Sequence, residues 1–478
     1  MAQLVYAKNP LLNISGITLF YEDETAKLSE LDKQQTSYVK KEIEHGNKLI
    51  CMQELGTYHF YVAIKKEAVN AEMLENVRCT GVRILQSLNA ARNKAVCITN
   101  ETQEGALSLA LAEGMALANY QFLKYFKDKK EKENSLKTIH IADKNTTAKA
   151  VDELQHVIEA TCIARTLVNE PYSYLNAVQF AKEITKLGKD AGFSVKVMNK
   201  KEIEAKKMGG LLAVNAGSVD APTFTIMEYK PEKAKNKKPL VLVGKGVVFD
   251  TGGLSLKPTP GSMDEMKCDM AGAAAVVGAM HAIATSKLPV HVVGLVPATD
   301  NRPGGNAVAP QDIITMMDGT TVEVVNTDAE GRLILADALV YARNYKPELC
   351  IDLATLTGAA MRAVGNYASA IMGTAEQPIL DRLAESGMRV YERTVQFPLW
   401  KEYGDELKSQ VADLKNLGAA NAGHISAGKF LEHFTAYPWI HIDIAGPAYS
   451  NSANQYRTSG GSGVGVRLLF DFIRNNYA

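Results

Sequence analysis

The stretch LVLVGKGVVF (residues 240–249) is almost entirely apolar, and Asp250, Thr251 and two glycines follow it directly. Four further apolar runs lie along the chain: VHVVGLV (290–296), VEVVN (322–326), LCIDLAT (349–355) and WIHIDIA (439–445). Patterns with helical spacing separate several of these runs. Apolar strands that alternate with helices are typical of a largely parallel sheet covered by helices on both faces. We therefore expect a three-layer α/β/α domain with a mixed, mostly parallel sheet.

The residues upstream predict a smaller α/β unit. TLFYE (18–22) and YHFYVAI (58–64) carry the β-branched and aromatic residues typical of strands, and helical spacing follows over about 68–92 and 104–127. A further helix is predicted to connect this unit to the larger one. The expected organisation is an N-terminal α/β domain over 1–146, a connecting helix over 147–171 and a larger domain over 172–478.

The composition is that of an ordinary globular protein with no global charge. The 478 residues include 53 Lys and Arg against 53 Asp and Glu, which gives a formal net charge of zero. We therefore expect neither nucleic acid nor an anionic membrane as a partner. No apolar run reaches the ~18 residues of a spanning helix, and no secretory signal is expected. The six cysteines are scattered without a C-x-x-C pair, which favours reduced thiols in a cytoplasmic protein.

Carboxylates gather around the ends of these apolar runs. Asp250 follows the first run, and Asp328 and Glu330 follow the run VEVVN. Asp269 lies in the first half of a helix predicted over residues 263–284. Ligands of an open α/β sheet bind outside the carboxyl ends of its strands. Burying carboxylates there is costly unless positive charge compensates them.

The residues alone leave two sources of that positive charge open. Lys245, Lys257 and Arg332 could compensate the carboxylates in a purely structural ion-pair network. Four carboxylates together, with two glycine turns that bring the backbone close, favour a metal centre instead. Such a group can surround two divalent ions about 3.5–4 Å apart, which polarise a substrate oxygen and lower the pKa of a shared water. The chemistry expected from a metal centre of this kind is hydrolysis.

Two other kinds of site, a histidine metal site and a phosphate-binding loop, do not fit the sequence around these carboxylates. None of the nine histidines lies within residues 243–258, 263–270 or 326–333, which carry the four carboxylates, and there is no H-E-x-x-H motif. His281 and His291 lie on the flanking helix and strand and are expected to be packed or surface residues, not ligands. By ligand chemistry alone, an oxygen-rich site without imidazole favours Mg²⁺ or Mn²⁺ before Zn²⁺. A phosphate-binding loop is excluded by spacing, because its motif needs a glycine and a hydroxyl residue where this chain has Pro239 and Gly246.

Two segments resemble a known family. NTDAEGRL (326–333) matches the signature of the leucyl aminopeptidase family of binuclear metallopeptidases, and VGKGVVFDTGGLSLKP (243–258) resembles that family's other metal segment. The likeness extends over most of residues 150–478 and includes LVNEP, MGGLLAVNAGS, LATLTGA, DLKNLG and GVRLL. The first 150 residues carry no matching motif, although the family has a smaller N-terminal α/β domain there. The resemblance implies a two-metal-dependent aminopeptidase that acts on short peptides.

The resemblance also implies a metal-binding role for five residues. Asp250 and Glu330 would bridge two divalent ions, which would be Zn²⁺, Mn²⁺ or both. Asp269 and the amine of Lys245 would complete the tighter site, and Asp328 would complete the looser, exchangeable one. Lysine is an unusual ligand because it must first lose its proton. Burial beside two dications shifts the lysine pKa in that direction.

Two cationic residues would act in the reaction by the same resemblance. Lys257 would stay protonated and stabilise the oxyanion. Arg332 would hold a bicarbonate ion that acts as general base on the water bridging the two ions. The segment from Lys257 to Asp269 is one residue longer than the family's spacing. If the turn after Lys257 does not absorb that residue, Lys257 is displaced. Cys268, next to Asp269, is expected to face the core.

The implied substrate is a peptide with a free N-terminus. An ion that coordinates the α-amine would place the first peptide bond over the attacking water. A Leu or similar apolar side chain would enter a pocket near Met266, Asn326, Thr355 and Ala445, although Met266 and Thr355 are equally well explained as packing residues. The family forms hexamers of two stacked trimers, and we therefore expect a homohexamer.

Two other functions stay open from the sequence. Some bacterial relatives also act as architectural DNA-binding proteins, but zero net charge without an evident basic stripe counts against that function here. A binuclear hydrolase of a phosphoester or another non-peptide ester would use the same carboxylates.

Overall fold

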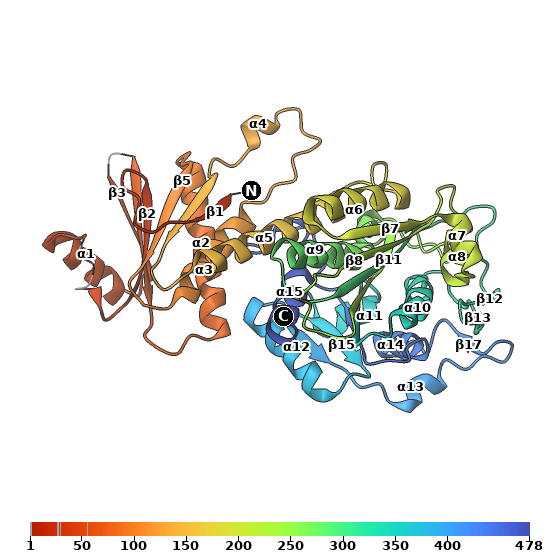
Figure 1. Cartoon of the computed structure of the whole chain (residues 1–478). Helices are drawn as coiled ribbons and strands as arrows, with labels where there is room; N and C mark the ends of the chain where they lie inside the picture. The colour runs from red at the N-terminus through yellow and green to blue at the C-terminus, as the bar shows by residue number, and fades with distance from the viewer. Residues whose placement is uncertain (1, 26–27, 29, 55) are drawn as a thin grey trace. The chain divides into compact units, whose positions relative to one another are not determined.

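The computed structural model describes residues 2–25, 28, 30–54 and 56–478. The chain divides into two compact units, which Figure 1 colours by residue number. Residues 1–159 with 452–459 form the first unit, and residues 160–451 with 460–478 form the second. A short segment near the C-terminus therefore belongs to the N-terminal unit.

The first unit contains a six-stranded sheet. Its strand order is β1-β6-β5-β2-β4-β3, and every neighbouring pair is parallel except β3 with β4. Helices α2 and α3 pack against each other. The elements up to the helix that crosses into the second unit are β1 (Gln3–Tyr6), β2 (Ser15–Tyr21), α1 (Lys33–Glu44), β3 (Leu49–Glu54), β4 (Thr57–Ile64), α2 (Ala71–Ala90), β5 (Ala95–Asn100), α3 (Gly105–Ala118), α4 (Lys129–Lys132), β6 (Thr138–Ala142) and α5 (Ala148–Asn169).

The second unit alternates helices and strands for most of its length. Its elements are α6 (Ala177–Ala191), β7 (Ser194–Met198), α7 (Lys200–Ala205), α8 (Gly209–Asn215), β8 (Thr223–Tyr229), β9 (Leu240–Gly244), β10 (Gly246–Asp250), η2 (Met263–Cys268), α9 (Ala271–Thr285), β11 (Val292–Asn301), β12 (Ile313–Thr315), β13 (Thr321–Glu323), α10 (Gly331–Ala342), η3 (Arg343–Tyr345), β14 (Leu349–Ala354), α11 (Gly358–Val364), β15 (Ser369–Gly373), α12 (Gln377–Val390), β16 (Thr394–Gln396), α13 (Lys401–Asp405), β17 (Leu414–Lys415), α14 (Gly423–His433), β18 (Trp439–Asp443), β19 (Tyr449–Ser450), β20 (Gly460–Gly461) and α15 (Val466–Asn476).

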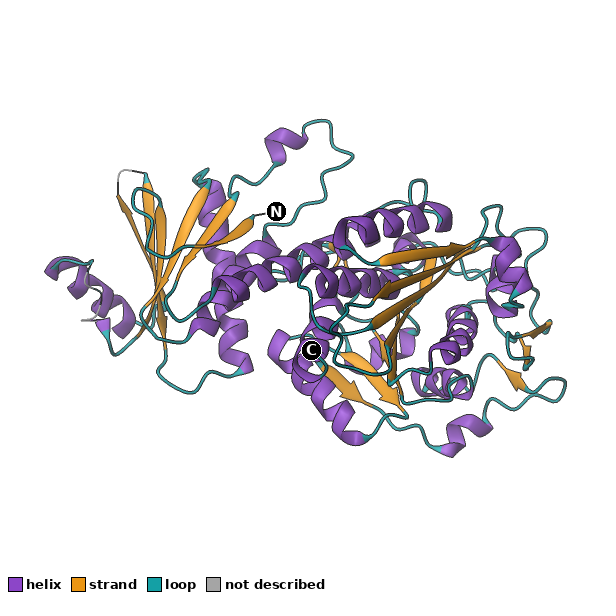
Figure 2. Cartoon of the chain, viewed as in Figure 1, coloured by secondary structure: helices purple, strands orange, loops and turns teal. Residues whose placement is uncertain are grey.

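A nine-stranded sheet forms the centre of the second unit, with helices around it (Figure 2). The strand order is β16-β15-β18-β14-β9-β11-β8-β7, and β10 pairs with β11. The central strands β18, β14, β9 and β11 are mutually parallel. Helices α10 and α14 share one hydrophobic core with one face of these strands, and α9 packs on the other face. The expected α/β/α architecture with a mixed, mostly parallel sheet is confirmed.

The prediction of a core strand at 322–326 is wrong. Strand β13 covers only Thr321–Glu323 and lies in a separate three-stranded sheet with β12 and β17. Beyond it, the backbone N–H groups of Val325 and Asn326 donate to the side-chain oxygen of Asn416, at 2.8 and 3.3 Å. An asparagine side chain therefore takes the place of a neighbouring strand, and the ladder stops.

The prediction of a single helix over 263–284 is also wrong. Residues Met263–Cys268 form a 3-10 helix, and the α-helix begins at Ala271. Asp269 lies at the junction, where its backbone N–H donates to the backbone oxygen of Met266 in the i to i+3 pattern of a 3-10 turn. Cys268 is buried, as expected.

The strand expected at 240–249 is interrupted at Lys245. β9 ends at Gly244 and β10 begins at Gly246. The backbone N–H of Lys245 donates to the oxygen of Leu353 at 3.0 Å, and its own oxygen accepts from Ala273 at 3.0 Å. The break therefore leaves the side chain of Lys245 near the carboxyl edge of the sheet.

One helical segment, Met263–Thr285, is long and apolar enough to cross a membrane by length and composition. The sequence analysis found no uninterrupted apolar run of that length. The segment includes α9, and nearly all of it is buried inside the second unit. A helix that is apolar on all sides is typical of a protein core as well as of a membrane span.

Close packing of α9 on the sheet predicts the effect of Gly272→Ala. A Cβ at Gly272 would lie 2.1 Å from the backbone oxygen of Leu353. We expect Gly272→Ala to lower the free energy of unfolding by ~1–3 kcal/mol, the usual cost of overpacking, although alanine is the better helix former. Chemical denaturation measures the change. Gly305→Ala is the matched control because no atom lies within 4 Å of a Cβ there. Unchanged stability of Gly272→Ala would contradict the expected close contact.

Helix α10 is anchored by Asp337, whose side chain is fully buried. Asp337 accepts the backbone N–H groups of Leu211 and Met317, at 2.9 and 3.0 Å. Burial raises the pKa of Asp337 to about 7, against the lowering effect of these N–H groups. Because α10 begins at Gly331, directly after Glu330, this anchor also supports the acidic segment.

The raised pKa of Asp337 predicts a pH dependence of stability. An acid whose folded-state pKa lies above its unfolded value favours folding when protonated, so its contribution is complete below roughly pH 4 and is lost as the pH rises through about 7. Asp337→Asn removes the titration but leaves only one acceptor oxygen for the two N–H groups, so the variant should be less stable than the wild type near pH 4. Between roughly pH 4 and pH 8, the stability difference should shift in favour of the variant by up to about 4 kcal/mol, because only the wild type must ionise a buried acid. Urea titrations at several pH values test this, with the exposed Asp381→Asn as a control that should follow the wild type. A stability difference that does not change with pH would refute the prediction.

Candidate active site

Polar residues gather at the carboxyl edge of the nine-stranded sheet. Lys245 follows β9, Asp250 ends β10 and Asn301 ends β11. Thr355 follows β14, and Asp443 ends β18. Since β9, β10, β11, β14 and β18 are parallel, these residues share one edge of the sheet. This is the edge at which open α/β sheets bind ligands.

Lys245 joins two of the expected carboxylates. Its ammonium group lies 2.8 Å from an oxygen of Asp269 and 2.8 Å from an oxygen of Glu330. It also donates to the backbone oxygen of Thr355 at 3.0 Å. The Thr355 hydroxyl donates to the same Asp269 oxygen at 2.8 Å. Lys245, Asp269 and Glu330 are all buried, so this is an ion-pair network largely removed from solvent.

Lys257 joins the other two carboxylates. Its ammonium group lies 3.0 Å from Asp250 and 2.5 Å from Asp328. The backbone N–H of Lys257 donates to the oxygen of Thr251 at 2.9 Å, which ties the loop to the end of β10. Despite the longer segment between Lys257 and Asp269, both side chains thus reach the acidic cluster.

The cluster holds more carboxylate oxygen than the lysines occupy. Ligand oxygens of Asp250, Asp328 and Glu330 all lie within 4.8 Å of one another. One oxygen each of Asp269 (Oδ2) and Glu330 (Oε2) is buried without a hydrogen-bond partner among the described residues. Buried carboxylate oxygens are rarely left unpaired. A compact set of oxygen donors with unpaired members fits divalent cations.

Crowding shifts the pKa values of the acids upward. Burial, followed by the charges of Glu330 and Asp250, raises the pKa of Asp328 to about 7, against the lowering effect of Lys257. Burial also raises the pKa of Asp269 well above its usual range. Protons therefore bind to the cluster more readily when no cation compensates the carboxylates.

Lys245 keeps its proton in this arrangement. Burial lowers its pKa, but the charges of Asp269, Glu330 and Asp250 raise it more, and the net pKa lies above the usual value. Only additional positive charge close to the amine reverses that shift. The neutral amine implied by the family resemblance is thus consistent with this environment only when cations are bound beside it.

Two glycines permit the close approach of these charged groups. Gly252 has a φ of +85°, and a Cβ there would lie 3.0 Å from a carboxylate oxygen of Asp328. A Cβ at Gly331 would lie 2.5 Å from Cε of Lys245. A side chain at Gly252 or Gly331 would therefore displace a charged member of the cluster.

Arg332 lies next to the cluster, in the first turn of α10, and is buried. Its Nη1 donates to the backbone oxygen of Asn416 at 2.8 Å. Burial lowers the pKa of Arg332 to about 10, although Glu330 and Asp443 raise it. The guanidinium therefore stays charged at neutral pH and places positive charge beside Glu330.

The expected pocket residues are all partly exposed: Met266, Asn326, Thr355 and Ala445. Asn326 accepts the backbone N–H of Asp328 at 2.8 Å, and Thr355 donates to Asp269. Met266 lies in the 3-10 helix that ends beside Asp269. Ala445 follows β18 at the same edge of the sheet.

Sequence analysis missed polar residues that hold the carboxylates in place. Asn301 donates to Asp250 at 2.9 Å and to the backbone oxygen of Thr327 at 3.0 Å. Asn301 ends β11, which runs beyond the expected 290–296. A prediction that extended this strand to its true end would have placed Asn301 at the carboxyl edge of the sheet. The side chain of Asn416 accepts hydrogen bonds from the backbone just before Asp328, although the two lie far apart in the sequence. No local sequence pattern marks Asn416 for this role.

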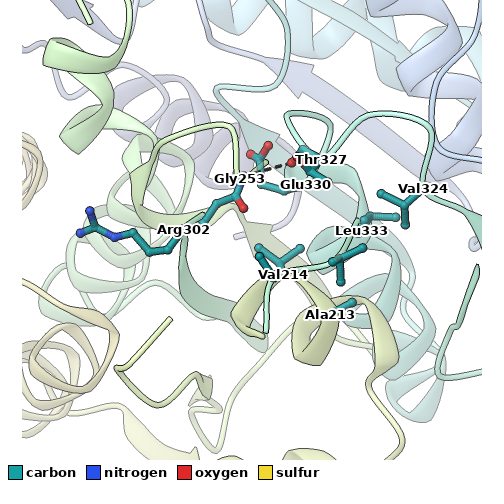
Figure 3. A pocket seen from close by; sticks show the side chains of 11 residues that line it. Ala213, Val214, Gly253, Arg302, Val324, Thr327, Glu330 and Leu333 are labelled. Carbon is teal, nitrogen blue, oxygen red and sulfur yellow. Dashed lines mark hydrogen bonds between the residues drawn. The ribbon is translucent and has the colours of Figure 1, made fainter. Parts of the chain in front are cut away.

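A narrow pocket adjoins the cluster on the side of α8 and β11. Figure 3 shows the residues that line it. Val214 and Leu333 form part of its apolar wall, and Gly253, Thr327 and Glu330 part of its polar wall. Glu330 therefore faces a hollow as well as the ion pair with Lys245.

Comparisons with known proteins identify the family of this chain. Residues 162–470 match the cytosol aminopeptidase family, catalytic domain. A probable cytosol aminopeptidase of Chlorobium limicola is 47% identical over 395 residues, which cover 80% of this chain and 78% of the relative. The solved bottromycin maturation enzyme BotP in complex with Mn is 29% identical, with a TM-score of 0.84 over 96% of this chain and 99% of that one. A mutant of tomato leucine aminopeptidase is 26% identical, with a TM-score of 0.86 over 100% of this chain and 97% of that one. The chain therefore belongs to the cytosol aminopeptidase family of peptide hydrolases.

Proposed function

We propose that this protein is a two-metal-dependent aminopeptidase that removes the N-terminal residue from short peptides. The observation that carries the proposal is the buried group of carboxylates at the sheet edge, in which Asp269 and Glu330 each keep an unpaired oxygen. Family membership supports the same reaction, because the relatives are probable cytosol aminopeptidases.

Five residues would hold two divalent ions, which we propose to be Zn²⁺, Mn²⁺ or both. Asp250 and Glu330 would contribute to both ion sites, Asp269 and neutral Lys245 to the tighter site, and Asp328 to the exchangeable site. When bound, such ions polarise a carbonyl and lower the pKa of a water molecule. The similarity to a protein solved in complex with Mn supports this assignment.

Lys257 and Arg332 would act on the substrate and on the water. Burial lowers the pKa of Lys257, but Asp250, Glu330 and Asp328 raise it more, so the ammonium group stays charged. It would stabilise the negative charge that develops on the scissile carbonyl oxygen. Arg332 would hold a bicarbonate ion, which would supply a general base for the reaction.

The substrate would be a short peptide with a free N-terminus and a Leu or similar apolar first residue. Its side chain would enter the region of Met266, Asn326, Thr355 and Ala445, where a methionine can adapt to several side-chain shapes. By family resemblance, we further propose a cytoplasmic homohexamer built as a dimer of trimers.

The proposed specificity is tested with three matched substrates. Leucine anilide should be hydrolysed, whereas N-acetyl-leucine anilide and an aryl phosphate should not, because only the first presents a free α-amine. Chelator should abolish the activity, and Zn²⁺ or Mn²⁺ should restore it. The assay measures release of the aromatic product. Turnover of the aryl phosphate alone would overturn the peptidase assignment in favour of an esterase.

The proposed ligand set is tested with Asp328→Asn. Because an amide is a weaker cation ligand than a carboxylate, this variant should lose one exchangeable ion per chain while folding normally. Its kcat should fall by ~10²–10³, the usual cost of losing an electrostatic group at a reacting centre. Elemental analysis after dialysis and circular dichroism measure metal content and folding. The exposed Asp381→Asn serves as the control. Full occupancy in Asp328→Asn would rule out the assignment.

A further inference from the structure

Two loops at the carboxyl edge of the sheet are joined by Thr327, which directly precedes Asp328. The Thr327 hydroxyl donates to the backbone oxygen of Gly252 at 2.6 Å and accepts the backbone N–H of Ser255 at 2.8 Å. In return, the backbone N–H of Thr327 donates to the Ser255 hydroxyl at 3.2 Å. We call these three bonds the Thr327 clamp. The clamp joins the loop that carries Asp328 to the loop that carries Lys257.

The surroundings of Thr327 leave none of its polar groups unpaired. Thr327 is 6% exposed, and Asn301 donates to its backbone oxygen at 3.0 Å. Gly253 has a φ of +64°, and a Cβ there would lie 2.9 Å from the Thr327 hydroxyl oxygen. The two loops therefore approach each other closely because position 253 carries no side chain. The hydroxyl of Thr327 both donates and accepts, so its removal leaves two backbone groups without their partner.

The loop that carries Lys257 has few other anchors. Leu254 and Leu256 are 46% and 60% exposed, so their side chains add little packing. Among the described residues from 254 to 257, one hydrogen bond remains besides the clamp and the ion pairs of Lys257. It runs from the backbone N–H of Lys257 to the oxygen of Thr251, within the same loop. The clamp is thus the uncharged link between the two loops.

The ion pairs of Lys257 do not replace this link when cations are bound. Asp250 and Asp328, which pair with the ammonium group, are also proposed metal ligands. Divalent cations at the same carboxylates would repel the ammonium group and weaken its attraction to them. The Thr327 clamp consists of uncharged groups, so this repulsion does not act on it.

We propose that Thr327 is a positioning residue for Lys257, and that its hydroxyl fixes the Lys257 loop against the acidic loop while cations occupy the site. The inference rests on the role in the reaction proposed above for Lys257. Misplacement of a reacting group by ~1 Å can cost ~10²-fold in rate. Because Lys257 would act on the charge that develops during the reaction, loss of the clamp should lower kcat and leave KM nearly unchanged.

Two substitutions separate the hydroxyl of Thr327 from the shape of its side chain. Thr327→Val keeps the shape and removes the hydroxyl, whereas Thr327→Ser keeps the hydroxyl. We expect Thr327→Val to lose ~10–100-fold in kcat with full metal content, and Thr327→Ser to retain most of the wild-type kcat. The exposed Thr374→Val is the matched control and should match the wild type. Loss of metal from Thr327→Val, or equal kcat losses in Thr327→Val and Thr327→Ser, would overturn the proposal.

Ser255→Ala tests the clamp from the other loop and keeps the test valid if Thr327→Val does not fold. Ser255 is partly exposed, and its hydroxyl accepts one bond of the clamp, so we expect this variant to fold normally. Its kcat should fall by ~2–10-fold, which corresponds to one neutral hydrogen bond. Circular dichroism verifies folding. Wild-type kcat in Ser255→Ala would contradict the inference.

A double substitution tests whether the clamp acts through Lys257. The kcat loss of Ser255→Ala should disappear when Lys257→Ala is also present, because the positioned group is then missing. An equal loss in both backgrounds would overturn the proposal. If instead Lys257→Ala alone keeps the wild-type kcat, the role of Lys257 in the proposed function fails, and the inference fails with it.

Hydrogen–deuterium exchange gives a readout independent of activity. The peptide that covers residues 253–257 contains the N–H of Ser255, which should be protected in the wild type with and without added Zn²⁺ or Mn²⁺. In Thr327→Val this N–H should exchange ~10-fold faster. A peptide over β14 should exchange equally in both proteins. Unchanged exchange in Thr327→Val, or lost protection in the wild type when cations are added, would refute the clamp whatever the outcome of the peptidase assays.

Discussion

Ionising four carboxylates at one largely buried sheet edge is costly unless positive charge lies among them, and this constraint governs the arrangement of the second unit. Lys245 and Lys257 each bridge two of the carboxylates. The unpaired oxygens of Asp269 and Glu330 and the raised pKa of Asp328 show that the compensation is incomplete. Binding of divalent cations is the chemical consequence that we propose.

The fold meets this constraint through irregular backbone at the ends of its strands and helices. The ladder breaks at Lys245, which leaves its amine among the acids. Gly331 gives that lysine room, and Asp337 anchors the helix that follows. Asn416 holds both the backbone before the acidic loop and the guanidinium of Arg332. The regular core thus supports a site whose own segments are turns and helix ends.

Much of this architecture was predictable because the apolar runs are long and continuous. The strand at 349–355 and the strand at 439–445 form where expected, since buried parallel strands need apolar residues throughout. The run at 322–326 has the same composition but ends as a strand at Glu323, because Asn416 supplies the next hydrogen bonds from a distant part of the chain. Local patterns carry no information about such a partner.

The sequence by itself determined the α/β class, the family and the set of acidic and basic residues that gather at the sheet edge, because short motifs preserve both residue type and spacing. Only the tertiary structure decided which lysine pairs with which carboxylate and which oxygens stay unpaired. It also revealed the pairing of Asp352 with His441 inside the sheet. These are contacts between residues far apart in the chain, and their energies depend on burial and distance in three dimensions, which no local pattern encodes.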